Sequence, residues 1–431
     1  MKSYASMTKE ELASEREVLL KKYNDFCAKN LKLDMSRGKP SSKQLNVSNE
    51  IFDIINSKSD FIAEDGIDTR NYGDLYGIEE AKKYFADVLD VDKDMVMAGG
   101  SSSLNLEYNL LSSAMLYGIN GCTPWKDLQE VKFLCPSPGY DRHFAITEHM
   151  GIKMIYVPYN DCELDIEMIE KLVADDESIK GMWCVPKYEN PLGITFSDET
   201  VKRLAKLNPK AKDFILIWDN AYFIHDIYED KKDTLYNIFD AVKGTKNEDM
   251  IYSFTSTSKI TIAGGGISAM ITSKKNLENI KKDITVSIIS YDKVNMLRHV
   301  KFLKNKENTI EHMKKHAAFL RPKFDLVKQI FSKELDGLDI AKWTKPNGGY
   351  FITFWTLNNL AKKVYERCKK AGIVLTQVGA AFPYGIDPND NCIRIAPSYP
   401  ELDELENAAN LFCICVKLES IEYYLINRRL T

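Results

Sequence analysis

The sequence predicts an α/β fold in which a mostly parallel sheet with helices on both faces is joined to a smaller α+β domain. From about residue 94 to about residue 255, short apolar runs of β type alternate with helical patterns, an order that is typical of parallel sheets. After about residue 300 the alternation ends. The length of 431 residues also exceeds the roughly 250–300 residues at which a single hydrophobic core stops growing. Two domains are therefore expected.

Six short apolar runs are the expected strands of the large sheet. They occupy residues 95–99, 131–135, 152–157, 179–185, 214–218 and 250–254. Earlier in the chain, residues 8–30 space their apolar side chains as an amphipathic helix does. The loop 34–45 that follows is rich in Gly, Pro and Ser, and we expect it to cross between the domains.

The C-terminal part shows a different pattern. A long charged helix after about residue 300 precedes a strand near 348–354, a helix from about 358 and a short strand at 392–396. These elements suit a smaller α+β domain. The expected division is an N-terminal segment of the small domain at 1–65, a large domain at 66–300 and a C-terminal small domain at 301–431.

The overall charge argues against nucleic acid as a partner. A formal net charge of −4, from 62 acidic and 58 basic residues, leaves no basic field that would bind a phosphate backbone. No apolar run approaches the ~18–20 residues that span a bilayer, and the first residues are charged rather than signal-like. We expect a cytoplasmic protein that makes no membrane contact.

Cysteines and histidines give no metal-site pattern. The nine cysteines contain no C-x-x-C pair. Five of them have apolar neighbours and are expected to be buried, reduced thiols: Cys135, Cys162, Cys184, Cys392 and Cys413. His312 and His316 have helical i, i+4 spacing, but they lie in the charged run EHMKKHAAF. We expect this pair on a solvated helix face, and no metal is expected in the site.

Five polar clusters follow the expected strands. Ligands of open parallel sheets bind beyond the carboxyl ends of the strands, so the clusters should converge on one rim. Each cluster alone would fit an ordinary cap or turn. Their joint placement predicts a binding site. The clusters are residues 99–103, 138–140, 190–193, 219–222 and 256–259.

The residue types at this rim are those that pyridoxal 5′-phosphate (PLP) requires. A helix that begins with small residues offers free N–H groups and a positive dipole end to a phosphate, so Gly100, Ser101 and Ser102 are the expected phosphate cradle. Ser256 can add a hydroxyl, and Ser258 lies in the same loop. These residues predict the phosphate end of a cofactor site.

The other residues of the rim suit the pyridine ring of PLP. Tyr140 can cover one face of the ring, and Asp219 can pair with its nitrogen. Asn190 and Tyr222 can both hydrogen-bond the ring oxygen. Lys259 is the amine expected to hold the cofactor covalently and then to move the substrate proton.

With these residues in place, the chain resembles the class I aminotransferases of the aspartate aminotransferase superfamily, PLP enzymes of fold type I. The motifs YGDLYG, GGSSSL, SPGY, ENPLG, DNAY, STSK, KPNGGYF and IRIAPS occur in the family's order over nearly the whole chain. The resemblance supports the cofactor roles of Asn190, Asp219 and Lys259. It also implies that Arg394 binds the substrate α-carboxylate and that the backbone of Gly38 meets the same group.

The detailed wording of four segments resembles one subgroup, the MocR-type aspartate aminotransferase-like domain. These segments are SRGKPSS, DTRNYG, CPSPGYDRHFAITEHMG and WCVPKYENP. Some members of the wider group are transcription regulators with an N-terminal winged-helix domain. Because only about thirty residues precede SRGKP here, a regulator is disfavoured.

One departure from the family concerns the phosphate. The family places an arginine about eight residues after the lysine, whereas this chain has KITIAGGGIS. The phosphate is then held by N–H groups, hydroxyls and the helix dipole, or by a cation from elsewhere; Lys39, Arg142 and Lys187 are candidates. We interpret the three glycines as a close-packed turn.

The expected activity is transfer of an amino group between an acidic amino acid and 2-oxoglutarate. The resemblance implies a homodimer in which Tyr72 reaches the phosphate of the neighbouring subunit. Arg37 is the first candidate for the distal carboxylate, with Lys39, Arg142 and Arg298 behind it. The alternatives are a β-lyase or decarboxylase on the same fold, or a PLP-binding sensor without turnover. Arg394 favours transamination, because decarboxylation would remove the carboxylate that it binds.

Overall fold

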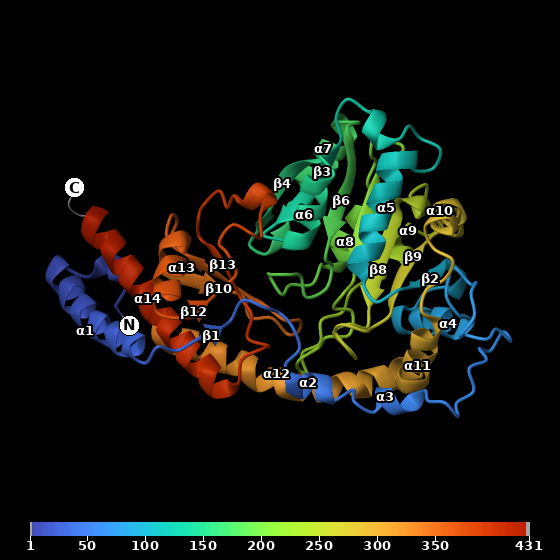
Figure 1. Cartoon of the computed structure of the whole chain (residues 1–431). Helices are drawn as coiled ribbons and strands as arrows, with labels where there is room; N and C mark the ends of the chain where they lie inside the picture. Colours follow the sequence, from blue (N-terminus) through green and yellow to red (C-terminus); the bar gives the residue numbers. More distant parts are fainter. Residues whose placement is uncertain (1, 428–431) are drawn as a thin grey trace.

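The computed structural model describes residues 2–427, and its largest layer is an eight-stranded sheet in the order β2-β9-β8-β7-β6-β3-β4-β5 (Figure 1). Neighbours from β8 to β4 are parallel, while β9 and β5 are antiparallel to their neighbours. The expected α/β class with a mostly parallel sheet is confirmed. The strands are β2 (Val96–Gly99), β3 (Lys132–Ser137), β4 (Lys153–Asn160), β5 (Glu163–Leu164), β6 (Ile179–Cys184), β7 (Ile215–Asp219), β8 (Ile251–Ser256) and β9 (Ser268–Thr272).

All six strands expected from the apolar runs are present. Two further strands, β5 and β9, were not expected from the sequence. The second of these, with the sequence SAMIT, joins β2 to β8 by pairing antiparallel with both. It therefore joins the edge strand β2 to the parallel strands in one continuous sheet.

Helices cover both faces of this sheet because its strands bury residues alternately on either side. On β3, Phe133 packs into one core cluster and Leu134 into another. The first cluster includes residues of α5 (Ser103–Tyr117), α6 (Asp141–His149) and α10 (Lys274–Ser287). The second includes residues of α7 (Ile166–Asp175), α8 (Asp198–Ala205) and α9 (Ile238–Val242).

A second group of elements lies at one end of the molecule (Figure 1). It holds an antiparallel sheet of β10 (Ala341–Trp343), β11 (Ile352–Thr356) and β13 (Cys392–Ile395). A parallel pair joins β1 (Leu33–Asp34) to β12 (Ile373–Val374), so an N-terminal strand completes a C-terminal unit. Their core is shared with the helices α1 (Lys9–Ala28), α13 (Ala361–Lys370) and α14 (Leu402–Asn427) and with part of α12 (Lys306–Leu335).

The 30-residue helix α12 (Lys306–Leu335) runs along one side of the molecule from this group toward α11 (Lys293–Leu303) and α4 (Glu79–Leu89) (Figure 1). It begins near the large sheet, where Met313 joins a cluster with Phe85 and Leu297. Its later residues pack into the core of the small sheets. The remaining helices are α2 (Ser42–Asn46), α3 (Ile51–Ile54), η1 (Tyr4–Ser6), η2 (Lys93–Met95), η3 (Trp125–Asp127), η4 (Glu248–Met250) and η5 (Pro383–Gly385).

The expectation for His312 and His316 is wrong. Both imidazoles are buried, at 7% and 1% exposure, and they lie 3.3 Å apart, Nε2 to Nε2. His312 also contacts Ser48 and the carbonyl oxygen of Ile260. The two histidines continue the buried stripe of α12 through Met313 and Leu320, while the lysines between them point away. The charged residues of the run EHMKKHAAF thus lie on the opposite face of the helix from the two histidines.

Four of the five expected buried cysteines are buried, whereas Cys162 is half-buried between β4 and β5. All nine thiols are free. Among residues 2–427, no helix has the length and apolar character needed to cross a membrane.

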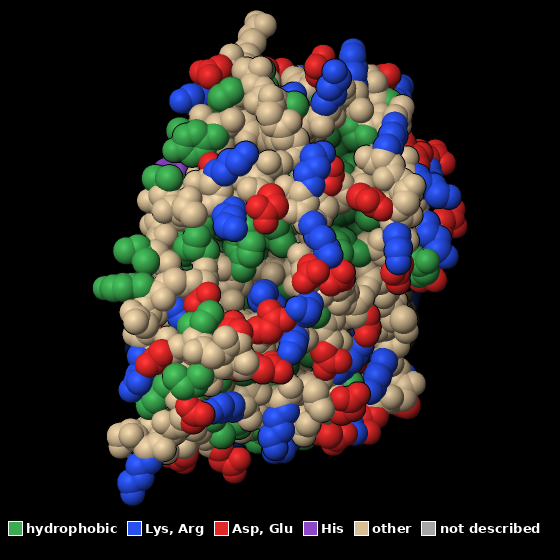
Figure 2. Space-filling view, turned by 90° about the vertical axis from the view of Figure 1, so that its right-hand side faces the viewer, with side chains coloured by type: hydrophobic (Ala, Val, Ile, Leu, Met, Phe, Trp, Pro, Cys, Tyr) green, Lys and Arg blue, Asp and Glu red, His purple; other side chains and the backbone are tan. Residues whose placement is uncertain are grey.

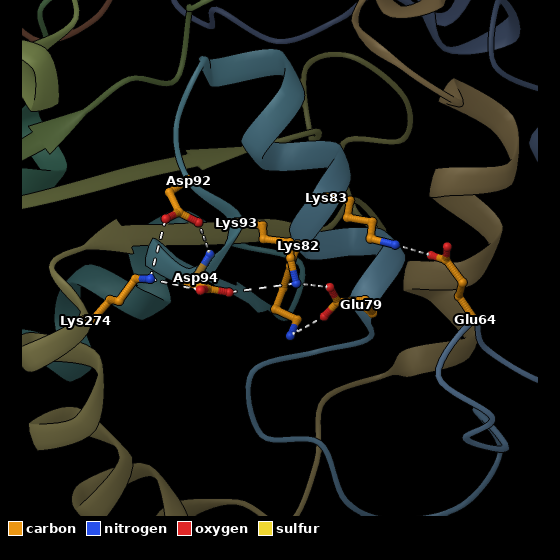
Figure 3. A network of polar contacts seen from close by, with 8 residues as sticks. All are labelled: Glu64, Glu79, Lys82, Lys83, Asp92, Lys93, Asp94 and Lys274. Atoms are coloured by element: carbon orange, nitrogen blue, oxygen red, sulfur yellow. Dashed lines mark hydrogen bonds and ion pairs between the residues drawn. The ribbon is translucent and has the colours of Figure 1, made fainter.

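Ion pairs connect α4 to its neighbours at the surface (Figure 3). Glu79 on α4 pairs with Lys82 at 2.6 Å and also with Lys93. Lys274, at the start of α10, lies 2.9 Å from Asp94. Most of these groups are exposed, so each pair contributes less than about 1 kcal/mol to stability. Figure 2 shows acidic and basic side chains interspersed over one face of the molecule.

Candidate active site

A pocket of about 500 Å³ lies beyond the carboxyl ends of four adjacent parallel strands, β8, β7, β6 and β3. The chain crosses from one side of β3 to the other between β4 and β6, which makes this the switch point where α/β sheets bind ligands. Each of the five polar clusters contributes side chains to its wall, the first through Ser102 and Ser103 alone. The lining residues include Arg37, Gly38, Ser102, Tyr140, Arg142, Asn190, Asp219, Tyr222, Ser256, Ser258, Lys259 and Arg394.

Three expected site residues do not line this pocket. Gly100 and Ser101 precede the lining residue Ser102 in the chain. The Gly100 carbonyl accepts a hydrogen bond from Ser268 at 2.7 Å. Tyr72 lies in a loop with 76% of its surface exposed. It makes no contribution to the pocket of its own chain.

Lys259 follows β8 and is partly buried in the pocket. Its Nζ lies over the Tyr222 ring, 4.9 Å from the centroid. Burial lowers the pKa of the Lys259 ammonium, and the charge of Asp219 offsets part of this effect. A larger fraction of neutral amine is thereby present, which is the nucleophilic form.

Asp219 ends β7 with only 4% of its surface exposed. Its Oδ2 lies 3.1 Å from Nε2 of His143, whereas Oδ1 is buried and has no hydrogen-bond partner among the described residues. An unpaired buried carboxylate oxygen costs free energy, and a cationic donor in the pocket would remove that cost.

Arg394 on β13 contributes from the small sheet. Its Nη1 donates to Asn190 Oδ1 at 3.2 Å and pairs with Asp141 at 3.1 Å. Its Nη2 donates to Thr376 Oγ1 at 3.1 Å. Asn190 lines the pocket and accepts from Arg394 through its amide oxygen, so the donor that it can offer a ligand is its amide nitrogen.

The wall near α5 can bind an anion. Ser102 is the N-cap residue of α5, but its side chain makes no capping hydrogen bond. The first N–H groups of the helix therefore remain available beside the hydroxyls of Ser256 and Ser258, which lie 2.5 Å apart.

Of the three proposed cations for a phosphate, only Arg142 lines the pocket. Lys39 lies over the ring of Tyr399, 4.0 Å from its centroid. Lys187 is paired 3.1 Å from Asp226 and also donates to a backbone carbonyl. The geometry therefore leaves Arg142 as the nearest of these candidates.

The glycines after Lys259 are only partly a close-packed turn. A Cβ on Gly266 would come within 2.8 Å of the Ser258 nitrogen, so this glycine allows the lysine loop to pack. Gly264 has open space around it. Gly38 also needs its small size, because a Cβ there would lie 2.1 Å from the Phe351 ring.

Several residues of the site escaped the sequence analysis: Glu107, Asp141, His143, Phe351 and Thr376. Two of them had a usable signal. His143 stands one helical turn after Tyr140, in the motif SPGYDRH. Glu107 is the single charge in the apolar stripe of α5 that contains Leu110, Leu111 and Ala114.

The chemistry of these groups fits PLP. Asp219 offers an unpaired anionic oxygen, Asn190 an amide donor, and Lys259 an amine with a lowered pKa. The fold and this pocket together define an α/β transferase of fold type I. A family model described as aspartate amino-transferase matches residues 7–428. The chain therefore belongs to the aspartate aminotransferase family.

Individual relatives agree with this assignment. An aspartate aminotransferase of Corynebacterium glutamicum is 40% identical over 98% of this chain and 100% of its own length. The crystal structure of an aspartate transaminase from the same species superposes with a TM-score of 0.94, at 40% identity over 98% of this chain and 99% of that one. A putative aminotransferase from Corynebacterium diphtheriae gives 0.91, at 42% identity over 94% and 100%.

Proposed function

We propose that this protein is a PLP-dependent aminotransferase that moves an α-amino group between an acidic amino acid, aspartate first, and 2-oxoglutarate. The observation that carries the proposal is the buried, unpaired Oδ1 of Asp219 in the same pocket as the Lys259 amine. A carboxylate and a lysine so placed suit the ring nitrogen and the aldehyde of PLP, respectively.

The remaining cofactor contacts follow from the pocket wall. Asn190 and Tyr222 would hydrogen-bond the ring oxygen, and Tyr140 would cover one face of the ring. Ser102, Ser256 and Ser258 would receive the phosphate, with Gly100 and Ser101 supplying the backbone before α5. When bound, PLP supplies the electron sink that makes the substrate Cα acidic.

The residues of the chain then have separate tasks. Arg394 binds the α-carboxylate and orients the amino acid, with Asn190 and Thr376 holding its guanidinium. Gly38 lets the loop before it approach that carboxylate. Lys259, as a free amine, would take the proton from Cα and return it at C4′, the aldehyde carbon of the cofactor.

A dicarboxylic substrate needs a second cation. Arg37 and Arg142 line the pocket, both with exposed side chains, whereas Arg298 is bonded to Asn295 and lies over Phe52. Of the two arginines at the pocket, Arg37 directly precedes Gly38, and we keep it as the residue for the distal carboxylate. Asp141 beside Arg142 would repel a second carboxylate there.

Four further parts of the proposal concern the whole protein. Residues 1–65 and 301–431 are assigned to the small domain and residues 66–300 to the large one; residues 1 and 428–431 lie outside the residues that the structure describes. Two chains form a homodimer, in which the exposed Tyr72 reaches the partner's phosphate site. The free thiols suit the cytoplasm. The segment SRGKPSS and the three segments named with it support membership of the MocR-type subgroup.

The direct test is a panel of amino acids offered to the PLP-loaded protein with 2-oxoglutarate, followed by glutamate formation. We expect aspartate to give the highest kcat/KM and aromatic amino acids to be slower by at least about tenfold, because the distal charge-assisted contact is missing. Equal rates for aspartate and alanine would remove the acidic specificity. Absence of glutamate with every donor would remove the proposed reaction.

A further inference from the structure

Glu107 is a buried charge that the reaction described above does not use. It lies on α5 with 0% of its surface exposed, surrounded by the apolar residues that pack this helix against the sheet. Neither carboxylate oxygen has a hydrogen-bond partner in the described part of the chain. An isolated buried carboxylate is costly, so a charged neighbour is needed to explain its presence.

That neighbour is His143. Glu107 Oε2 lies 3.4 Å from Nε2 of His143, and the same nitrogen lies 3.1 Å from Asp219 Oδ2. The contacting atoms of the three groups all lie within 4.8 Å of one another, and all three residues are buried. One nitrogen thus faces two carboxylates.

The imidazole is held in this direction by packing. Its ring stacks on Trp183 at 4.0 Å between centroids with an 8° interplanar angle, and it meets Tyr140 edge-on at 4.9 Å. A ring clamped between two aromatic side chains cannot turn its Nε2 elsewhere without breaking both contacts. The shared position between the carboxylates is therefore a fixed feature of the site.

Two buried carboxylates of like charge favour a proton between them. Burial and Asp219 raise the pKa of Glu107. Burial lowers the pKa of His143, but the two carboxylates outweigh this effect and raise it to about 9. Other titratable groups near the three residues are Tyr140, Glu189, Tyr222 and Lys259.

We propose that Glu107 is a positioning residue that keeps His143 protonated, so that the imidazolium holds Asp219 as a carboxylate with Oδ1 turned to the pocket. The inference rests on the proposed function, because Asp219 is taken to pair with the ring nitrogen of the cofactor. Glu107 itself touches neither cofactor nor substrate. It supplies a second negative charge, so that the two carboxylates and the protonated His143 together carry a net negative charge.

Histidine NMR tests this without any turnover. The full chain is labelled in its imidazoles, and the His143 signal is assigned by its loss in His143→Gln. In wild type at pH 7.5 we expect the imidazolium form. In Glu107→Gln, which removes the charge and keeps the shape, the titration midpoint should fall by at least about one pH unit, because a nearby opposite charge shifts a pKa by ~1–3 units.

Glu419→Gln is the matched control, since Glu419 is also buried but pairs with Arg367 on α13. It should leave the His143 midpoint unchanged. A neutral His143 in the wild-type protein at pH 7.5 would overturn the proposal even if Glu107→Gln did not fold. An unchanged midpoint in a folded Glu107→Gln would overturn it as well.

The loaded enzyme gives a second readout. With PLP bound, Glu107→Gln should slow the half-reaction with aspartate by roughly tenfold while leaving KM within about twofold, because the substrate contacts stay in place. A raised KM with unchanged kcat contradicts a role acting through Asp219. A failure of the proposed function would instead appear as no reaction in wild type, with the His143 titration still as expected.

Discussion

At the scale of single residues, Lys259 is the most exacting test of the site. Lys259→Ala should abolish the covalent link to PLP and the visible absorbance of the purified protein, because no other lysine lines the pocket among the described residues. Absorbance spectra and borohydride reduction followed by peptide mapping measure this. If the variant still attached PLP at one defined lysine under borohydride, Lys259 would not be the cofactor residue.

Asp219 makes a separate prediction, because its free oxygen is the expected partner of the ring nitrogen. Asp219→Asn keeps the shape but loses a charge-assisted hydrogen bond of ~1.5–3 kcal/mol, so loss of the Cα proton should slow by about 10–150-fold. PLP should remain bound through Lys259 and the phosphate contacts. Single-turnover rates with aspartate measure the effect, and equal rates in variant and wild type contradict the assignment.

The two arginines at the pocket should differ in which substrates they affect. Arg37→Ala should lower kcat/KM for aspartate by about 10–150-fold more than for alanine, because only aspartate has a distal carboxylate. Arg394→Ala should weaken every amino acid, since each has an α-carboxylate. Steady-state kinetics on both substrates separate the roles.

Arg142→Ala is the comparison variant for this pair. If it rather than Arg37→Ala discriminates against aspartate, the distal cation is Arg142 and the repulsion from Asp141 is weaker than argued. If Arg37→Ala lowers both substrates equally, Arg37 serves the α-carboxylate or the phosphate instead.

At the scale of elements, the buried histidines of α12, His312 and His316, predict how the stability of the fold depends on pH. Burial and His312 lower the pKa of His316 from 6.5 to about 4. The unfolded chain then binds a proton before the folded chain does. The stability from a neutral His316 is present above pH 6.5 and is lost as pH falls to about 4, by up to roughly 3 kcal/mol.

Urea unfolding at pH 7, 6 and 5 measures this loss. His316→Gln should be less stable than wild type at pH 7 and should show a shallower fall toward pH 5. His149 is exposed, so His149→Gln should keep the wild-type slope. Parallel curves for wild type and His316→Gln would mean that another group dominates the acid response.

The large sheet and α5 show where sequence patterns suffice and where they do not. The six strands were predictable because a doubly buried strand is a continuous apolar run, whereas β9 follows three glycines and has a serine and a threonine at its ends. The convergence of Tyr140, Asn190, Asp219 and Lys259 follows from parallel topology alone. Glu107 required the structure, because a lone charge in an apolar stripe does not say which partner pairs with it.

At the scale of the whole molecule, the site as built from one chain lacks the expected tyrosine at the phosphate. Tyr72 is 76% exposed and lies outside the pocket of its own chain. In a homodimer with two-fold symmetry, each chain would lend this residue to the other. The prediction is that Tyr72 and Lys259 act in one site but come from different chains.

Mixed dimers test this arrangement directly. Tyr72→Phe alone should weaken PLP binding by about tenfold, through loss of one hydrogen bond to a charged group, and Lys259→Ala alone should be inactive. When the two variants are mixed and refolded in equal amounts, half of the dimers are mixed, and each has one site with both Tyr72 and Lys259 intact. High-affinity, active sites should therefore return to roughly a quarter of the wild-type number. Each variant refolded with itself is the control. If mixing returns no high-affinity sites while both chains still dimerise, Tyr72 does not serve the neighbouring subunit, and the phosphate depends on Ser102, Ser256, Ser258 and Arg142 of its own chain.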